Sequence, residues 1–413
     1  MISRKLTSRS TASLAALTLI LGMTGSGARA QGAPVTEMPE HRGGGRPVDR
    51  PDVRVDLRIP IAASPTPAST VRIDSPGNYV LSGDRFCSGD GIRVEADDVT
   101  IDLDGFSLVG PDSGSSVGIF MDGRRNVEIR NGTIRDFGGR GIHDKNGTGT
   151  AYGKRIIGIR AISNGSCGLC LGGDGNLIVD CLVADNKGSG LCVGRSIVRN
   201  NVFLNNETGG IAPGDGSVVE GNVVVRSNAA GVMARSGCII KGNSVTDNAN
   251  SGIYGEGGCL IEGNVSCGNN RSNTPGYYAG IRVVTDCIVR GNSVRGNLQN
   301  NIFSVRSGNV LEDNLATAPS DTMGNGFFFR IKDNYFSNNR ASGNGHDFAG
   351  EIPEGAGDGG GNVSLKHWDP PATTPAKTGS PSVPAAPAPS PAPAEPPGSG
   401  VPTPRSDPGS LKS

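Results

Sequence analysis

Asp122, His143 and Lys145 form a group of residues whose types could support acid–base catalysis. A carboxylate beside an imidazole and an amine can take up and return protons or stabilise a developing charge. Hydrolysis of a glycosidic bond needs two facing carboxylates, and Asp122 has no evident partner in the sequence. The alternative is that all three are ordinary solvated side chains. We therefore treat them as candidate catalytic residues, with acid–base and charge-stabilising roles.

A second group of residues suits the binding of an anionic sugar. Arg235 and Arg282 could neutralise carboxylates, and outward aromatic rings could stack on sugar rings. Ordinary solvated side chains are the alternative for this group as well. The candidate substrate-binding residues are Phe120, Arg235, Tyr254, Glu256, Arg282, Phe303 and Phe328.

A recurring pair of residues, glycine or asparagine followed by an aliphatic or aromatic residue, places both groups. The pair occurs eleven times, from Gly91-Ile92 to Gly326-Phe327. Successive side chains of a β-strand point to opposite faces, so each inward aliphatic residue leaves the next residue outward. Every candidate residue stands one or three positions after such an inward residue. We therefore expect the candidates on one outward face, beside the longer loops, where binding sites are usually found.

Asparagine also recurs at a nearly constant spacing of 20 to 28 residues in the middle of the chain. A period in this range is typical of a solenoid, and Asn at one corner of every coil predicts a ladder of stacked side-chain amides. The residues of this predicted ladder are Asn201, Asn222, Asn243, Asn264, Asn292, Asn314 and Asn334.

The residues two positions before the ladder asparagines alternate in charge. In a parallel, in-register stack, each charge would lie between two of opposite sign, and such pairs are mildly stabilising. We interpret the series as a salt-bridge stripe that fixes the register of the coils; a charged binding face is the alternative. The series is Arg199, Glu220, Lys241, Glu262, Arg290, Glu312 and Lys332.

The nine cysteines include two sets that would be stacked by the same repeat. Cys170 and Cys192 follow the Gly-aliphatic pair on adjacent coils, within the spacing that a disulfide tolerates. Three further cysteines precede the ladder asparagines by five residues, so at least one of those three cannot pair within the set. They are Cys238, Cys259 and Cys287. A single Cys-x-x-Cys, formed by Cys167 and Cys170, does not predict a metal site, and we expect no metal and no cofactor.

Strings such as those of residues 99–106 and 239–245 resemble the right-handed parallel β-helix repeat proteins. That pectate-lyase-like superfamily includes pectate lyases, polygalacturonases, mannuronan epimerases, phage tailspikes and carbohydrate-binding periplasmic proteins. The resemblance covers residues 75–350 and implies an all-β fold, a single-stranded right-handed parallel β-helix of about eleven coils. The enzymatic motifs are mostly absent: Arg330-Ile331-Lys332 matches one polygalacturonase segment, but the other segments and the Asp-Pro-His of the epimerases are missing.

The chain ends differ in composition from the repeat. A positive start, an apolar stretch and Ala28-Arg29-Ala30 predict an export signal, so we expect a periplasmic or extracellular protein without a transmembrane segment. The expected organisation is a signal peptide at 1–30, a disordered linker at 31–50, an N-terminal cap at 51–90, the β-helix at 91–348, a closing segment at 349–369 and a Pro-rich disordered tail at 370–413.

The function expected from these features is the binding of an extended, acidic polysaccharide along one face of the β-helix. A formal net charge of zero lacks the basic excess typical of nucleic-acid binding. The alternatives are a polysaccharide lyase, hydrolase or uronate epimerase, and a non-catalytic structural envelope protein. The sequence leaves catalysis, the glycan and the disulfide pairing open.

Overall fold

The computed structural model describes residues 57–145, 151–273, 278–318 and 324–364. The predicted signal peptide, the linker and the Pro-rich tail lie outside the described residues, as do residues 51–56 of the predicted cap and 365–369 of the closing segment. Within the described part the regular elements are short β-strands joined by turns, with one short 3-10 helix at Gly355–Gly357.

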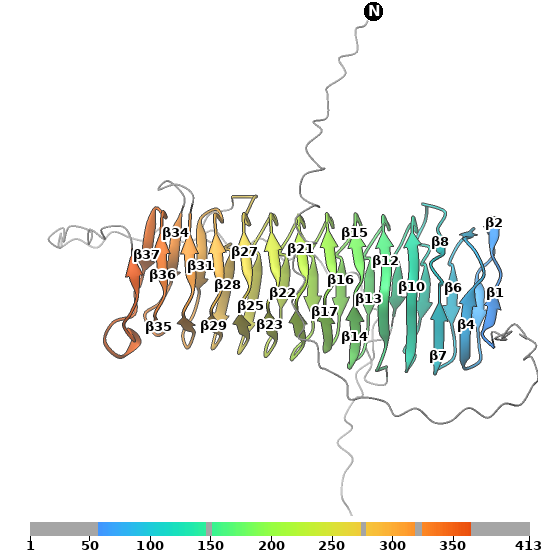
Figure 1. Ribbon diagram of the computed structural model, residues 1–413, viewed down its shortest axis with the longest axis horizontal. Coiled ribbons are helices and arrows are strands. Elements are labelled where there is room, and N and C mark those ends of the chain that lie inside the picture. The colour runs from blue at the N-terminus through green and yellow to red at the C-terminus, as the bar shows by residue number, and fades with distance from the viewer. Residues whose placement is uncertain (1–56, 146–150, 274–277, 319–323, 365–413) are drawn as a thin grey trace, which may run out of the picture. The chain divides into compact units, whose positions relative to one another are not determined.

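The described residues wind into successive coils, and each coil contributes a strand to each of three parallel series (Figure 1). The first series forms a 13-stranded sheet, and the other two join around a corner into a 25-stranded sheet. Parallel strands joined by crossovers adopt a right-handed connection in nearly all proteins. The fold is therefore a right-handed parallel β-helix, as the repeat predicts.

The first series, which we call the groove sheet, carries the strands that follow the Gly-aliphatic pairs. Its strands are β3 (Val71–Ile73), β6 (Ile92–Val94), β9 (Ile119–Met121), β11 (Ile142–Asp144), β13 (Leu169–Leu171), β16 (Leu191–Val193), β19 (Ile211–Pro213), β22 (Val232–Ala234), β25 (Ile253–Gly257), β28 (Ile281–Thr285), β31 (Asn300–Ser304), β34 (Asn325–Phe329) and β37 (His346–Gly350).

The second series carries the alternating charges, and the third follows it after the asparagine corner. The second series comprises β1 (Ile59–Ile61), β4 (Gly77–Leu81), β7 (Val99–Asp102), the first halves of β10 (Val127–Arg135) and β12 (Arg155–Ile162), β14 (Asn176–Val179), β17 (Ser196–Arg199), β20 (Val218–Glu220), β23 (Ile239–Lys241), β26 (Leu260–Glu262), β29 (Ile288–Arg290), β32 (Val310–Glu312) and β35 (Tyr335–Ser337). The third comprises β2 (Ser64–Ala68), β5 (Arg85–Cys87), β8 (Ser107–Val109), the second halves of β10 and β12, β15 (Leu182–Ala184), β18 (Val202–Leu204), β21 (Val223–Val225), β24 (Ser244–Thr246), β27 (Val265–Cys267), β30 (Ser293–Arg295), β33 (Leu315–Thr317), β36 (Arg340–Ser342) and β38 (Val363–Ser364).

The core is a column of aliphatic side chains that stack from coil to coil. Ile119, Ile142 and Leu169 are aligned in register and fully buried, whereas the residue after each is partly exposed. The glycine of the pair is required by close packing. A Cβ on Gly118 would lie 2.3 Å from Ile134 Cγ2 and 2.4 Å from the Gly141 carbonyl oxygen, far inside van der Waals contact. The Gly-aliphatic pattern is therefore a packing signature of the coil.

The groove sheet has 13 strands rather than the eleven that the pattern predicts. The two additional strands lie at the ends. Val71 is in register with Ile92, and Phe348 is in register with Phe327. The pattern misses them because Thr70 and Asp347 stand where the other coils have glycine or asparagine. The predicted cap thus contains a regular coil of its own.

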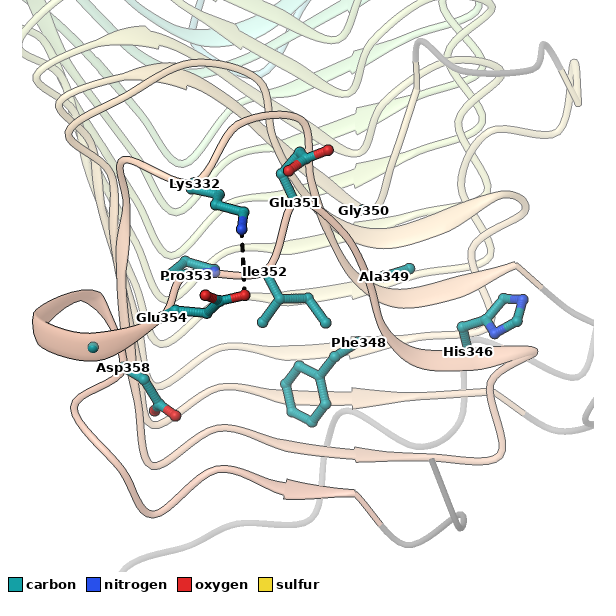
Figure 2. A pocket seen from close by; sticks show the side chains of 11 residues that line it. Lys332, His346, Phe348, Ala349, Gly350, Glu351, Ile352, Pro353, Glu354 and Asp358 are labelled. Atoms are coloured by element: carbon teal, nitrogen blue, oxygen red, sulfur yellow. Dashed lines mark hydrogen bonds and ion pairs between the residues drawn. The ribbon is translucent and has the colours of Figure 1, made fainter. Parts of the chain in front are cut away.

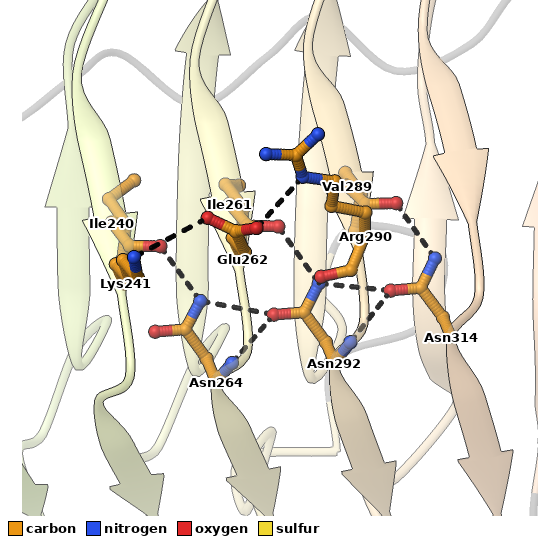
Figure 3. Close-up of polar contacts among 9 residues, drawn as sticks. All are labelled: Ile240, Lys241, Ile261, Glu262, Asn264, Val289, Arg290, Asn292 and Asn314. Atoms are coloured by element: carbon orange, nitrogen blue, oxygen red, sulfur yellow. Dashed lines mark hydrogen bonds and ion pairs between the residues drawn. The ribbon is translucent and has the colours of Figure 1, made fainter.

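The asparagine ladder is present, and its buried amides are satisfied. Asn264 Nδ2 donates to Asn292 Oδ1 (3.0 Å) and to the Ile240 carbonyl (2.9 Å), and its Oδ1 accepts from the backbone N–H of Asn243 (2.9 Å). The same pattern repeats along the corner between the second and third series, as Figure 3 shows for Asn264, Asn292 and Asn314.

The last member of the predicted ladder is wrong. Asn314 bonds to Asn339, 25 residues later, whereas Asn334 accepts from the backbone N–H of Asn309 (3.0 Å) at a different corner. The longer coil moves the true partner beyond the position that the earlier spacing predicts. Lys332 is displaced for the same reason: Glu312 is in register with Ser337, and Lys332 forms an ion pair with Glu354 (3.3 Å).

Candidate functional site

Two adjoining hollows lie on the outer side of the groove sheet, and we call them together the groove. The larger has a volume of about 840 Å³ and the smaller about 310 Å³, and both are lined by Met233 and Tyr254. The larger is lined further by Asp174, Cys192, Val193, Gly194, Arg195, Ala212, Pro213, Gly214, Asp215, Ala234, Arg235 and Glu256, and the smaller by Ala229, Ala230, Asn250, Ser251, Tyr278 and Arg282.

The groove follows from the sizes of the outward side chains in successive coils. Cys192 and Ala212 are aligned in register on β16 and β19, and Met233, Tyr254 and Arg282 are aligned on β22, β25 and β28. The small side chains of Cys192 and Ala212 leave a depression in the outer surface of the groove sheet. The larger side chains on the following strands form its wall. The alternation of inward and outward residues in each strand fixes this arrangement.

Arg235 and Glu256 are two charges in the groove that remain available to a ligand. Both are exposed, and neither forms an ion pair with any residue that the structure describes. The other carboxylates are engaged: Asp174 Oδ1 accepts the backbone N–H of Arg195, and Asp215 Oδ1 accepts that of Ser236, each at 3.1 Å. These two carboxylates therefore hold the turn of the next coil.

Tyr254 and Arg282 form a packed pair at the edge of the groove. The Arg282 guanidinium lies over the Tyr254 ring, with its central carbon 5.1 Å from the ring centroid. Burial raises the pKa of the Tyr254 hydroxyl above its ordinary value, so the hydroxyl remains a neutral hydrogen-bonding group at physiological pH. The pair thus presents a cation held on an aromatic ring, which orients the guanidinium before any ligand arrives.

Asp122, His143 and Lys145 lie on neighbouring coils, away from the residues that line the groove. Within the described residues no hydrogen bond or ion pair joins the three, and Asp122 and Lys145 are exposed. Burial, assisted by the Arg140 guanidinium, lowers the pKa of His143 to about 4. The imidazole is therefore neutral at physiological pH, and it is a weak base rather than a proton donor.

The outward phenylalanines differ in exposure. The Arg93 guanidinium lies over the Phe120 ring, with its central carbon 4.4 Å from the ring centroid. The Phe120 and His143 rings meet edge to face, with their centroids 5.6 Å apart. Phe303 is only 3% exposed and packs against Phe328 at a centroid distance of 5.2 Å. The expected alternation fails in β31, where all five residues are buried. Phe303 therefore does not offer a ring face to a ligand.

A buried ion pair involves Asp144, the residue after His143, and it is not among the residues expected from the sequence. Lys154 Nζ is 2.7 Å from Asp144 Oδ2, and neither side chain is exposed. Asp144 Oδ1 accepts the backbone N–H of Gly123 (2.8 Å), and Lys154 Nζ donates to the Gly172 carbonyl (3.1 Å). The alternation of inward and outward side chains along the strand could have indicated a buried carboxylate. Asp144 stands two residues after the inward Ile142 and must itself point inward.

Three thiols gather beside the groove. Cys170 is in register with Cys192, as predicted, but the Cys192 thiol also interacts with the Cys167 thiol. That interaction lowers the pKa of Cys167 and raises the pKa of Cys192. Cys167 is therefore a second candidate partner for Cys192, besides the predicted partner Cys170.

We expect exposure to a disulfide oxidant to link Cys192 to Cys170 or to Cys167. The two thiols lose two electrons and two protons, and the oxidant is reduced to two thiols. Peptide mapping without reduction, after alkylation of free thiols, should find Cys192 in a disulfide. The variant Cys192→Ser should lack every cross-link to that coil. Full alkylation of Cys192 in the oxidised wild type would contradict the expectation.

A third hollow, of about 740 Å³, lies at the C-terminal end of the coil stack (Figure 2). Phe348 and Ile352 pack against the core there, and the ion pair of Lys332 and Glu354 crosses the rim. None of the candidate residues lines this hollow. Its apolar floor is the end of the core column, which the segment after β37 covers.

Comparison with known proteins gives one family match and several similar solved structures. Residues 91–274 match the family described as periplasmic copper-binding protein (NosD). No curated protein sequence matches the chain. In the part of the chain that the structure describes, no helix is long and apolar enough to cross a membrane.

Three of the similar solved structures are polysaccharide-active proteins by their names. The A-module of the mannuronan C-5 epimerase AlgE6 from Azotobacter vinelandii is 17% identical, with 76% of this chain and 91% of that chain covered and a TM-score of 0.46. A mutant of the periplasmic alginate epimerase AlgG is 15% identical, with 73% and 80% covered and a TM-score of 0.48. The catalytic unit of an alpha-1,3-glucanase from Streptomyces thermodiastaticus is 17% identical, with 71% and 63% covered and a TM-score of 0.44.

The parallel register of the strands, the stacked asparagine corner and the aliphatic column together establish the architecture. The chain is a right-handed parallel β-helix repeat protein.

Proposed function

We propose that the protein binds an extended, acidic polysaccharide in the groove on the outer side of β16, β19, β22, β25 and β28. The observation that carries the proposal is the combination of Arg235, which has no ion-pair partner among the described residues, with the Tyr254–Arg282 pair around the two adjoining hollows. A stripe of outward residues runs across successive coils, so a ligand that follows it meets similar positions repeatedly. Such a surface suits a polymer better than a compact small molecule.

The chemistry of the groove matches a chain of uronate residues. Arg235 and Arg282 would bind carboxylates, since the guanidinium fork pairs with a carboxylate through two hydrogen bonds. Met233, 52% exposed, and the edge of the Tyr254 ring would pack against the apolar faces of the sugar rings. The exposed Glu256 would accept hydrogen bonds from sugar hydroxyls and would disfavour a ligand with a carboxylate at that position.

The hydrogen bonds that the acidic residues of the groove already accept favour a binding function over hydrolysis. Glycoside hydrolysis uses two carboxylates on opposite sides of the scissile bond. Glu256 is exposed and has no ion-pair partner among the described residues, but Asp174 and Asp215 each accept a backbone N–H of the neighbouring coil. A carboxylate that took part in catalysis would have to give up this hydrogen bond, and the turn of the neighbouring coil would lose it. Lyase, hydrolase and epimerase activities are therefore the alternatives that a product assay must test.

The matched family is described as copper-binding, and the thiols of this chain are the candidate ligands. Thiolates are suitable ligands for Cu(I), and Cys238, Cys259 and Cys287 are stacked and buried. Their Sγ atoms approach carbonyl oxygens, including Gly214 O (3.3 Å) from Cys238 and Arg235 O (3.0 Å) from Cys259. No group of three or more His, Cys, Asp or Glu side chains in the described ranges converges on a metal position. The residues present do not fit a copper centre of three or more ligands.

The predicted signal peptide and the periplasmic description of the matched family agree on export, which we include in the proposal. An exported polysaccharide-binding protein would meet its ligand in the periplasm or outside the cell.

Calorimetric titration with a panel of polyuronates and neutral polysaccharides tests the proposal. We expect binding to acidic polymers that weakens as salt rises, since exposed charges are screened. Arg235→Ala should weaken it about tenfold, which corresponds to about 1.4 kcal/mol, and Tyr254→Ala should weaken it further by releasing Arg282. Arg295→Ala, which removes an exposed arginine from the third series, is the matched control and should bind as the wild type does.

Absence of binding to every acidic polymer would overturn the proposal and leave the structural-protein alternative. Equal weakening by Arg295→Ala would show that the groove is not the site. Analysis of each bound polymer for shortened chains, new double bonds or inverted C5 centres would distinguish hydrolase, lyase and epimerase activity from binding alone.

A further inference from the structure

The outer side of the second series carries two parallel stripes, and we call them together the charged face. One stripe is the series of alternating charges, and the other is a row of aliphatic residues two positions earlier in each strand. The charge stripe comprises Arg199, Glu220, Lys241, Glu262, Arg290 and Glu312, and the aliphatic stripe comprises Ile197, Val218, Ile239, Leu260, Ile288 and Val310.

The aliphatic stripe is open to solvent. Ile197, Ile239 and Ile288 are 46%, 40% and 41% exposed, and the residues between them in register are partly exposed. The inward residues of the same strands fill the core, so the outward ones are additional apolar surface. A continuous exposed apolar row bordered by charges is typical of a surface that meets another macromolecule.

The charged side chains form ion pairs along the stripe and still remain exposed to solvent. Glu262 lies 3.0 Å from Arg290 and 3.9 Å from Lys241 (Figure 3). The side chains of Lys241 and Arg290 are nevertheless 54% and 47% exposed. Exposed ion pairs of this kind contribute little on their own, so the ends of these side chains remain available to a partner.

The stripe has an even number of charges, and uncharged residues bound it at both ends. Val179 precedes Arg199 in register, and Ser337 follows Glu312. Reading the six charges from β17 to β32 gives plus, minus, plus, minus, plus, minus. Reading them in the opposite direction gives the opposite sign at every position. The stripe is therefore complementary to its own reverse.

We propose that two copies of the chain associate through the charged face with their coil stacks antiparallel. A two-fold axis that lies in the face, along the strand direction and between β23 and β26, reverses the order of the coils. It leaves each stripe opposite the same stripe of the partner. Each charge then meets its opposite, Arg199 with Glu312, Glu220 with Arg290 and Lys241 with Glu262, while the aliphatic stripes pack together. Such an isologous contact is the common form of homodimer interface.

The other face-to-face two-fold arrangement is disfavoured. An axis parallel to the coil stack would place each coil opposite its own copy, so like charges would meet, or the aliphatic stripe would meet the charge stripe. The charged face belongs to a different series from the groove sheet. The dimer therefore leaves the groove accessible, and this inference does not depend on the proposed function.

The extent of the face sets the expected strength of the contact. The stripe spans only six strands at a spacing of about 4.8 Å. The area that it can bury is therefore small beside that of most permanent interfaces, which bury about 1,200 Å² or more in total. We therefore expect a reversible dimer whose fraction increases with protein concentration and decreases with salt, rather than an obligate one.

Sedimentation equilibrium of the full-length protein over a concentration series tests the proposal. We expect the wild type to dimerise and Ile239→Lys, in the middle of the aliphatic stripe, to weaken dimerisation at least about tenfold. Val265→Lys is the matched control, because Val265 is 46% exposed on the third series. A wild type that stays monomeric at every concentration, or equal weakening by both variants, would overturn the proposal. Circular dichroism verifies that each variant is folded.

A variant with the whole stripe inverted tests the antiparallel arrangement itself. Its six substitutions, Arg199→Glu, Glu220→Lys, Lys241→Glu, Glu262→Lys, Arg290→Glu and Glu312→Lys, keep every attraction along the stripe. The inverted protein should dimerise with itself but not with the wild type, since like charges would then meet in the antiparallel arrangement. Preferential mixed dimers of the differently tagged proteins would show a parallel arrangement and would contradict the proposal.

Discussion

Lys154→Ala should destabilise the protein by about 3–5 kcal/mol, because it leaves a buried carboxylate without its partner. Lys154 Nζ and Asp144 Oδ2 are 2.7 Å apart, and both side chains are fully buried. Among the described residues, the one other hydrogen-bond partner of Asp144 is the backbone N–H of Gly123, which cannot neutralise its charge. Thermal and urea denaturation followed by circular dichroism measure the loss.

Two control variants separate the loss of the ion pair from the loss of packing. Replacing both partners together, with Asp144→Leu and Lys154→Met, should restore much of the stability, since apolar residues of similar size often replace a buried ion pair at little cost. Lys145→Ala, at an exposed neighbouring position, should change the free energy of unfolding by less than about 0.5 kcal/mol. A Lys154→Ala variant as stable as Lys145→Ala would refute the assigned role of the pair.

Asn264→Ala is the second substitution for which we expect a large effect, a loss of about 3 kcal/mol or more. The side chain makes hydrogen bonds to Asn243, Ile240 and Asn292, all in buried surroundings. Each buried polar group left unpaired costs about 1–3 kcal/mol, and alanine leaves several unpaired at once. The substitution interrupts the ladder in the middle of the stack, where neighbouring coils depend on it.

Asn228→Ala is the matched control for the ladder, since Asn228 is exposed and outside it. We expect its melting temperature to stay close to that of the wild type. If Asn264→Ala unfolded at the same temperature as Asn228→Ala, the ladder would not be a source of stability.

The repeat could be recognised in the sequence because neighbouring coils place equivalent residues in register. Each ladder asparagine needs the next one as its hydrogen-bond partner, so the spacing in the sequence records the geometry. The spacing does not predict the partners where a coil changes length. The coil between Asn314 and Asn339 has 25 residues, so the partners predicted for Asn334 and Lys332 are wrong. The spacing also fails at the end coils, where Thr70 and Asp347 replace the usual glycine or asparagine.

The outward placement of Arg235, Tyr254, Glu256 and Arg282 also followed from the sequence, because inward and outward residues alternate along a strand. The contacts of each side chain with residues outside its own strand could not be predicted from this alternation. The burial of Phe303 depends on how neighbouring coils pack. The lowered pKa of His143 depends on burial and on the charge of the Arg140 guanidinium. The candidate catalytic residues are therefore neighbours in the structure but not a connected group, and their role remains a prediction.

Oxidative footprinting of the side chains tests the proposed function most directly, because the groove contains two reactive and accessible groups. Met233 is 52% exposed and Tyr254 is half-buried, whereas Tyr152, 54% exposed, lies outside the groove. Hydroxyl radicals would be generated with and without a saturating polyuronate, and oxidation of each residue measured by mass spectrometry. The proposal predicts that the polymer protects Met233 and Tyr254 and leaves Tyr152 unchanged. Protection of Tyr152 with unchanged oxidation of Met233 and Tyr254 would contradict it.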